Sequence, residues 1–349
     1  MSSSTYWHFE DSNKLATCLT RTLRALVKGR MVKASIVIVN FNGKRFLGSC
    51  LSSIHDSGRI FDDFEVTLVD NGSTDGSIEY VKKNFPGVRL IWNEKNLGFA
   101  EGNDIGIVAS RGDHVVLLNS DTVVTPTWLV ELIKTAESDA NVGITGPKTL
   151  RFDRRTLDTT GHVLHHKIGE AENRGSGEID YGQYDEETDV LGVQFSCVLI
   201  KREVIDSIGL LDDKMFLYLE DVDYCVRARL SGWRVVYCPS SVIYHFAGGS
   251  TSAKRSWNTR KHGFANRLRV ILKNYSALNM LKWGSFGFVL CWVAMLASIK
   301  NRTQDCLGYF YAFWWNLLNL PVKERIEVQR KRVMSDDMIF RYSVKGRRW

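Results

Sequence analysis

Short apolar runs alternate with helix-like segments from residue 34 to residue 146, and this alternation restricts the possible folds more than any other feature. The first run, SIVIV at 35–39, is rich in β-branched residues and has almost no polar position, which is typical of a strand buried on both faces. Further strands are predicted at 66–69, 88–92, 114–118 and near Gly143, with helices at 44–55, up to Asn84, up to Ser110 and from Pro126. This βαβ succession predicts an α/β fold with a mixed, mainly parallel sheet and helices on both faces.

Polar side chains collect where four of these strands end. They are Asn40 and Asn42, Asp70 and Asn71, Asn96, and finally Asn119 and Asp121. Asn, Asp and Gly are common in any loop, so one such loop would indicate little. Open α/β sheets bind ligands at the carboxyl ends of their strands, and four polar loops in succession favour a nucleotide-type pocket.

Three features beyond the loops could carry chemistry. Asp121 in LLNSDT offers a carboxylate that could hold a divalent cation against a diphosphate, although an Asp after a strand is often an N-cap. Glu220 and Asp221 begin a predicted helix, where paired acids suit general-base work or complement the helix dipole. His245 ends a strand before a Gly-rich loop and could complete a metal site or be structural.

The stretch from Arg151 to Asp189 has a weaker pattern and is rich in Gly, Glu and Asp. It is expected to form irregular loops and short strands over the pocket. Its histidines, His162, His165 and His166, could bind metal, but a surface or acceptor-side role is favoured because no carboxylate has matching spacing.

Taken in order, these segments resemble the family 2 glycosyltransferases of GT-A fold, a Rossmann-like three-layer sandwich, and most closely a rhamnosyltransferase-like branch. The resemblance covers roughly residues 34–252 and rests on SIVIVNFNG, LVDNGSTDGS, NEKNLGFAEGNDIG, LLNSDT, FLYLEDVDYCVRARLSGW and HFAGGS. Each signature alone is modest, but six in the same order are specific.

The resemblance implies a role for each matching residue. The nucleotide-sugar pocket would be lined by Asn40, Asn42, Asp70, Asn71, Asn96, Gly98, Asn103, Asn119 and Ser120, with Asp70 and the backbone near Asn40 at the base and ribose. Asn119 stands where the DxD-type motif has its first acid, so Asp121 would be the metal ligand, supported by His245. Asp221 matches the catalytic base, with Glu220 and Asp223 as further candidates.

The chemistry that this implies is a single inverting displacement. Mg²⁺ or Mn²⁺ would neutralise the departing nucleoside diphosphate, and Asp221 would deprotonate the acceptor hydroxyl. The donor would be dTDP-rhamnose or another dTDP- or UDP-sugar, and the acceptor a polyprenyl-linked or cell-surface glycan. The QxxRW motif of processive polymerases is missing after SGWRV, so the addition of one sugar or a few is expected.

The net charge of +7 conceals two opposite halves. From Lys254 onward there are 19 Lys and Arg against 5 Asp and Glu, whereas the residues before it are net acidic. This basic region also holds two uncharged segments of 17 residues, 283–299 and 306–322, the second rich in aromatic residues. Such a pattern favours membrane association, mostly as interfacial or re-entrant helices; a helical hairpin packed on the catalytic domain with a solvated basic face is the alternative.

Three regions are therefore expected: an N-terminal extension (1–33), the catalytic domain (34–253) and a basic helical region (254–349). The 7 scattered cysteines predict no disulfide framework and favour a reducing cytoplasm. Together with the basic region, this predicts a location at the cytoplasmic face of the cell membrane. Two alternatives stay open. One is a nucleotidyltransferase, for which NFNGKR is a poor phosphate loop; the other is a nucleic-acid-binding protein using the basic region, although no nucleic-acid partner is expected.

Overall fold

The computed structural model describes residues 32–246, 257–300 and 305–343. The predicted N-terminal extension, most of the Gly-rich loop after His245 and the last basic residues of the chain lie outside these ranges.

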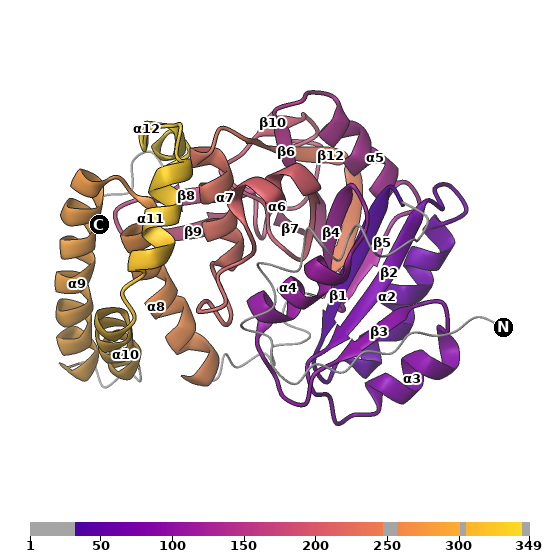
Figure 1. The fold of residues 1–349 in the computed structure, drawn as a ribbon, viewed down its shortest axis with the longest axis horizontal. Helices are drawn as coiled ribbons and strands as arrows, with labels where there is room; N and C mark the ends of the chain where they lie inside the picture. The colour runs from indigo at the N-terminus through magenta and orange to yellow at the C-terminus, as the bar shows by residue number, and fades with distance from the viewer. Residues whose placement is uncertain (1–31, 247–256, 301–304, 344–349) are drawn as a thin grey trace.

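One mixed sheet of ten strands forms the centre of the molecule (Figure 1). Its main path runs β10-β12-β6-β11-β4-β1-β2-β3, with β5 paired to β12 and β7 paired to β6; β8 and β9 form a separate hairpin. The strands are β1 (Ala34–Asn40), β2 (Phe64–Asp70), β3 (Arg89–Trp92), β4 (His114–Asn119), β5 (Thr122–Val124), β6 (Val142–Arg151), β7 (Leu157–Thr159), β8 (His162–His165), β9 (Glu170–Asn173), β10 (Thr188–Asp189), β11 (Cys197–Lys201) and β12 (Arg234–His245).

The predicted mixed, mainly parallel sheet is confirmed. β1 is parallel to both β2 and β4, and Asn40 lies in register with Asp70, so the two polar ends meet at one edge. β11 is inserted antiparallel between β4 and β6, while β12 is again parallel to β6. The carboxyl ends of β1, β2, β4 and β12 consequently point to the same side of the sheet.

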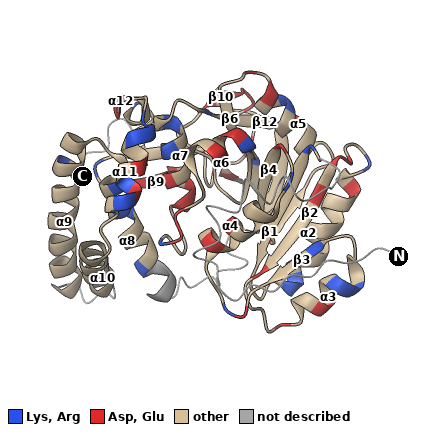
Figure 2. Cartoon of the chain, in the orientation of Figure 1, with Lys and Arg blue, Asp and Glu red and all other residues tan. Residues whose placement is uncertain are grey.

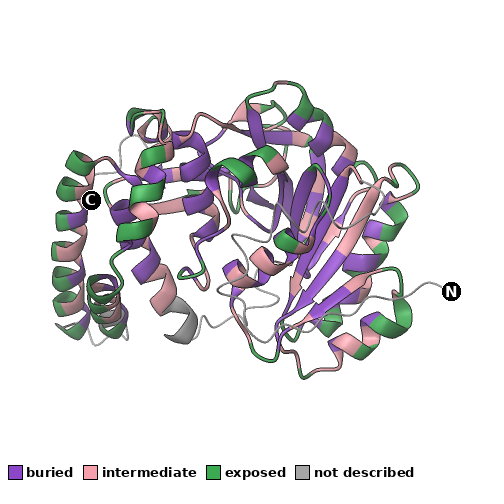
Figure 3. Cartoon of the chain, viewed as in Figure 1, coloured by how far each residue is buried: buried purple, intermediate pink, exposed green. Residues whose placement is uncertain are grey.

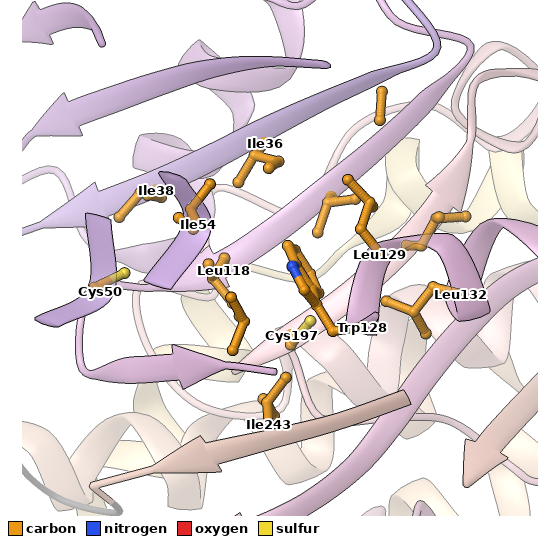
Figure 4. Packing of buried hydrophobic residues seen from close by; sticks show 14 of the residues in the cluster. Ile36, Ile38, Cys50, Ile54, Leu118, Trp128, Leu129, Leu132, Cys197 and Ile243 are labelled. Carbon is orange, nitrogen blue, oxygen red and sulfur yellow. The ribbon is translucent and has the colours of Figure 1, made fainter. Parts of the chain in front are cut away.

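Helices cover both faces of this sheet, as predicted. The helices of the α/β part are α2 (Lys44–Ser57), α3 (Ser77–Asn84), α4 (Phe99–Ala109), α5 (Trp128–Glu137), α6 (Arg202–Ile208) and α7 (Glu220–Leu230). One face packs against α2 and α5 around the buried Trp128, with Leu118 and Leu129 beside it (Figure 4). The opposite face packs against α4, α6 and α7 around residues such as Val37, Leu117 and Tyr224. Two apolar layers thus hold a three-layer sandwich.

The C-terminal helices gather at the end of the molecule opposite β3 and α3 (Figure 1). They are α8 (Trp257–Asn274), α9 (Ala277–Lys300), α10 (Asp305–Leu318), α11 (Val322–Lys331) and α12 (Asp337–Phe340). α8 lies innermost: Ile271 and Tyr275 pack with Val222 and Val226 of α7 in one buried cluster. This basic helical region is thereby built onto the helix that begins with Glu220 and Asp221.

Two basic residues of α8 are buried, which differs from the solvated basic face considered above. Arg269 and Lys273 are almost fully inaccessible and pair with Asp212, and Lys273 also pairs with Asp223 of α7. Their charges serve the contact between α8 and the α/β part and are not available to lipid.

α9 presents an apolar stripe to the outside, interrupted by the exposed Lys282 and Ser285. Most of its exposed large residues are three positions apart, which keeps them on one side of the helix: Leu278, Leu281, Phe286, Val289, Trp292, Val293, Leu296 and Ile299. The segment Ala277–Ile299 has 23 residues, few of them buried, and is long and apolar enough to cross a membrane. Figure 2 shows α9 and α10 almost without charge, and Figure 3 shows the outer side of α9 exposed.

Candidate active site

The buried pair Asn40 and Asp70 forms the floor of the site where β1 and β2 end. Asn40 Nδ2 donates to Asp70 Oδ2 at 2.8 Å and to Ser73 Oγ at 3.1 Å, and the Ser73 amide donates to Asp70 Oδ1 at 2.8 Å. Asn40 Oδ1 is buried without a hydrogen-bond partner among the described residues. Asn40 and Asp70, both predicted to line the nucleotide-sugar pocket, therefore contact each other directly.

Asn42 joins the loops that follow β1 and β2. It adopts a left-handed conformation with φ of 51°, and its Oδ1 accepts the Thr74 amide at 2.8 Å. Its own amide donates to Ser73 Oγ at 2.8 Å. The two loops are thereby fixed to each other along the edge where a nucleotide is predicted to bind.

The side-chain amides of three residues predicted to line the pocket form hydrogen bonds within the protein. Asn71 Nδ2 donates to the Gly98 carbonyl at 2.8 Å, and Asn103 Nδ2 donates to the Phe99 carbonyl at the same distance; both residues are buried. Asn96 Oδ1 accepts the Gly98 amide at 2.9 Å. These amides shape the loop from Asn96 to Phe99.

Gly98 is required by close packing and by its backbone conformation. Its φ is +91°, and a Cβ built on it would lie 2.6 Å from both Cδ2 and the carbonyl oxygen of Phe216. The same carbonyl accepts the Phe99 amide at 2.8 Å. Gly98 thus allows the start of α4 to lie directly on the loop that leads to α7.

Replacing Gly98 by alanine should destabilise the protein by about 1–3 kcal/mol or more. The added methyl group would collide with the backbone of Phe216, and the positive φ is itself unfavourable for alanine. Urea unfolding measures the change. Gly87→Ala is the matched control, since nothing lies within 4 Å of a Cβ there. Equal midpoints for the two variants would show that the close approach to Phe216 is unimportant.

Asp121 in the turn after β4, His245 at the end of β12 and Asp158 in β7 form a chain of buried side chains. β5 pairs with β12, with Thr122 opposite His245, which brings the turn after β4 against the end of β12. His245 Nε2 lies 3.3 Å from Asp121 Oδ1, and its Nδ1 lies 2.9 Å from Asp158 Oδ2. Burial alone would lower the pKa of His245, but the hydrogen bonds and charges of the two carboxylates outweigh it and raise the pKa to about 9.

This donor set fits a divalent cation. Asp121 and His245 offer one oxygen and one nitrogen that lie 3.3 Å apart, and Asp158 can hold the Nδ1 proton so that Nε2 can bind metal. No group of three ligands occurs among the described residues, so other positions would be left for water and phosphate oxygens. Sequence reasoning missed Asp158, which lies in a stretch without clear periodicity.

The turn between β4 and β5 contains Asn119 and Ser120. The backbone carbonyl of Asn119 accepts a hydrogen bond from Thr122 Oγ1 at 2.6 Å, and the backbone amide of Asn119 donates to the Ser196 carbonyl at 2.9 Å. Ser120 is buried, and a Cβ on Gly43 would lie 3.2 Å from its Oγ. Both residues therefore lie beside the loop after β1, at the same edge as Asn40.

Glu220 and Asp221 begin α7 after a turn with unusual backbone geometry. Tyr218 and Leu219 both have positive φ, of 73° and 67°, although neither is glycine. Asn266 of α8 donates through Nδ2 to the Tyr218 carbonyl at 2.7 Å and to the Leu217 carbonyl at 3.1 Å. Asn266 thus helps to hold the turn that aims the acidic pair, a role that its basic surroundings in the sequence do not signal.

The three acids of α7 have different surroundings. Burial, together with the charge of Asp221, raises the pKa of Glu220 well above its usual value. Asp223 is fully buried and accepts from Arg227, Lys273 and Asn274, which assigns it to structure rather than to chemistry. Asp221 is 14% exposed at its side chain and lies 3.2 Å from His162 Nε2.

One short segment links the two acidic centres. Asp158, which contacts His245, and His162, which contacts Asp221, are four residues apart, so their Cα atoms are at most about 14 Å from each other. Asp121 and Asp221, a hundred residues apart in sequence, are therefore linked through this one segment. Of the three predicted histidines only His162 contacts Asp221; the Nε2 of His165 lies 3.3 Å from Glu172, and His166 bonds Ser343.

The family to which this arrangement belongs is shown by direct comparison. Residues 35–209, half of the chain, match the family model for glycosyl transferase family 2. The chain belongs to this family. Membership confirms the predicted resemblance and favours a glycosyltransferase over a nucleotidyltransferase.

Curated relatives of this glycosyl transferase family 2 chain include proteins of known and unknown role. It is 29% identical over 234 residues to an uncharacterized protein of Sinorhizobium fredii, covering 62% of this chain and 24% of that one. It is 28% identical over 207 residues to the N-acetylglucosaminyl-diphospho-decaprenol L-rhamnosyltransferase of Mycobacterium tuberculosis, covering 53% of this chain and 67% of that one. The chain thus spans about a quarter of the length of the first relative and about two thirds of the length of the second.

Solved structures share the fold. The complex of GalNAc-T7 with UDP, GalNAc and Mn²⁺ aligns with a TM-score of 0.54 at 18% identity, over 70% of this chain and 49% of that one. The mannosyltransferase PcManGT of Pyrobaculum calidifontis, in complex with GDP-Man and Mn²⁺, aligns with a TM-score of 0.52 at 14% identity, over 89% and 91%. These likenesses confirm the predicted GT-A fold.

Proposed function

We propose that this family 2 chain transfers one sugar from a dTDP- or UDP-sugar to a hydroxyl of a lipid-linked or cell-surface glycan, with inversion at the anomeric carbon. The observation that carries the proposal is the pair of centres joined by residues 158–162: Asp121 with His245, and Asp221 with His162. A cation-binding pair linked by one short segment to a partly exposed carboxylate is what a leaving diphosphate and an attacking hydroxyl need. The mycobacterial relative, named as a rhamnosyltransferase acting on a decaprenol diphosphate, supports this choice.

Asp121 and His245 would hold Mg²⁺ or Mn²⁺. When bound, the cation supplies charge neutralisation for the departing nucleoside diphosphate. Asp158 keeps the imidazole of His245 oriented through Nδ1, and Asn40 with Asp70 forms the floor for the base and ribose.

Asp221 would take the proton of the acceptor hydroxyl. The free oxygen then attacks the anomeric carbon from the face opposite to the diphosphate, so one displacement inverts the configuration. Burial and the charge of Asp221 raise the pKa of the neighbouring Glu220, which disfavours a second negative charge beside the base. No covalent nucleophile is required by this arrangement.

A panel of nucleotide sugars tests the proposed function. The full-length protein is incubated with dTDP-rhamnose first, then with other dTDP-, UDP- and GDP-sugars, together with a polyprenyl-diphosphate-linked acceptor. We expect transfer from a dTDP- or UDP-sugar with inverted product. If no donor in the panel gives either transfer or hydrolysis, the proposed function is excluded.

Asp121→Ala should remove the effect of the cation on donor binding, because the variant loses the only carboxylate that contacts His245 Nε2 in the described structure. Donor affinity is measured by calorimetry with and without Mn²⁺. We expect Mn²⁺ to increase the affinity of the wild type and to leave that of the variant unchanged. Asp113→Ala, at the exposed amino-terminal end of β4, is the control and should behave as wild type.

We further propose that the apolar stripe of α9 lies in the interface of the cytoplasmic face of the membrane. The stripe is far larger than the scattered apolar residues of ordinary surfaces. The other side of α9 packs on α8, where a Cβ on Gly284 or Gly287 would touch Leu272 or Leu268. α8 carries the buried ion pairs to Asp212 and Asp223. If α9 crossed the membrane, it would draw α8 and these charged groups toward the hydrocarbon. This favours an α9 that lies in the plane of the membrane.

Charges placed on this stripe should release the protein from lipid. The double variant Val289→Glu and Leu296→Glu is compared with the wild type in flotation with vesicles of phosphatidylglycerol and phosphatidylethanolamine. The wild type is expected to float and the variant to remain at the bottom. Ile60→Glu, an exposed apolar residue after α2, is the control and should float; a floating double variant would refute the stripe as the contact.

A further inference from the structure

His162 is buried against the acid that the proposed function uses as its base. The residue is 5% exposed, its amide donates to the Gly192 carbonyl at 2.8 Å, and its Nε2 lies 3.2 Å from Asp221 Oδ2. A Cβ on Gly192 would come within 3.3 Å of the imidazole, so the ring is closely packed as well. His162 therefore meets Asp221 in a fixed orientation.

The contact with Asp221 defines which ring nitrogen of His162 is the donor. A carboxylate oxygen only accepts, so the 3.2 Å contact between Nε2 and Asp221 Oδ2 is a hydrogen bond in which Nε2 carries the proton. Nδ1 is buried and has no hydrogen-bond partner among the described residues. His162 therefore donates through Nε2 to Asp221.

We propose that His162 is a positioning residue for Asp221 in the transfer reaction, an inference that rests on the proposed function. The Asp221 carboxylate has two fixed donors: His162 Nε2 to Oδ2, and the Val222 amide to Oδ1 at 2.8 Å. Together they restrict the rotation of the carboxylate and leave its other lone pairs for the acceptor hydroxyl. The nearby Glu220 does not donate to Asp221 in the described contacts and does not replace His162.

The proton balance of the step is simple. The acceptor O–H bond breaks and its proton passes to the Asp221 carboxylate, while the acceptor oxygen bonds to the anomeric carbon. The bond from that carbon to the diphosphate oxygen breaks, and its electron pair leaves with the nucleoside diphosphate. His162 keeps its Nε2 proton throughout and acts only through the orientation of Asp221.

His162→Leu and His162→Gln separate this role from packing. Leucine removes the donor, whereas the glutamine amide can place an N–H near the position of Nε2. We expect His162→Leu to lower kcat by about 10²-fold, as a misplaced reacting group does, with the donor KM unchanged. His162→Gln should recover most of that loss.

His165→Leu is the matched control, because His165 lies on the same strand, is similarly buried and pairs with Glu172 instead. It should keep the wild-type kcat. In an Asp221→Asn background, His162→Leu should have little additional effect on kcat, since the group it positions is already inactive.

The outcomes are distinguishable. An inactive wild type across the donor panel contradicts the proposed function, whereas an active wild type with a wild-type-like kcat for His162→Leu overturns the role of His162 alone. An equal loss in the Leu and Gln variants, or in His165→Leu, also overturns it. If the Leu variant does not fold, His162→Asn is compared with His162→Gln, because the shorter amide reaches less far toward Asp221; equal kcat values then contradict the proposal.

Discussion

Asp221→Asn should abolish sugar transfer while donor binding remains close to that of the wild type. The amide keeps the size of the carboxylate and a hydrogen-bonding oxygen for the Val222 amide, but it cannot take a proton at neutral pH. General-base catalysis typically contributes about 10²–10⁴-fold, so kcat should fall by at least that range. Asp221 is the least buried of the three acids of α7, which is the position an acceptor can reach.

Two measurements decide the outcome. Transfer is followed with the donor and acceptor found in the panel, and donor affinity is measured by calorimetry on the same preparations. Asp213→Asn, an exposed acid that precedes α7, is the control for the loss of one negative charge and should retain full activity. Turnover like that of the wild type in Asp221→Asn would disprove the assignment of the base.

Lys273→Met should lower the free energy of unfolding by about 3–5 kcal/mol, which is typical when one partner of a buried charge network is removed. Lys273 Nζ donates to Asp212 Oδ2 at 2.5 Å and to Asp223 Oδ2 at 2.7 Å, and all three side chains are nearly inaccessible. Methionine keeps the length of the chain but leaves the two carboxylates with one cation fewer. Urea unfolding measures the change, and Lys323→Met, exposed on α11, should leave the midpoint unchanged.

The pH dependence of this loss has a defined sign. Burial would raise the pKa of Asp212 and of Asp223, but the cations around them, led by Lys273, hold both pKa values below the usual range. Their stabilisation is therefore present above the unfolded value of about 3.9 and is lost as the pH falls below it. The difference in stability between the wild type and Lys273→Met should shrink as the pH is lowered from 5 toward about 2. A difference that stays constant over this range would contradict the role of the carboxylates.

The sheet could be predicted because its signals are local. Each of the first strands is a single apolar run that ends in a polar loop, and β1, β2 and β4 begin and end within two residues of the predicted limits. The antiparallel insertion of β11 between β4 and β6 could not be predicted, since an apolar run such as CVLIK has the same composition in either direction. Strand order depends on contacts between distant residues.

The sequence motifs nominate single residues of the candidate site, such as Asp121, Asp221 and His245, but not the residues that contact them. Asp158 lies in an aperiodic stretch, and Asn266 lies on a basic helix beyond the predicted catalytic domain. Arg269 and Lys273 look like solvated charges in the sequence, yet they are buried because Asp212 and Asp223 face them from another element. Such pairings become visible only in three dimensions.

Residues 158–162 couple the position of the proposed cation site to that of the proposed base, because Asp158 contacts His245 and His162 contacts Asp221. Gly161 has a φ of +116° and would place a Cβ 2.8 Å from Val190, so the segment has little freedom to adjust. A substitution that moves Asp158 would also move His162, and selection for a new acceptor in this segment would alter the donor side at the same time. New acceptor preferences should therefore evolve more readily in loops outside residues 158–162 than within them.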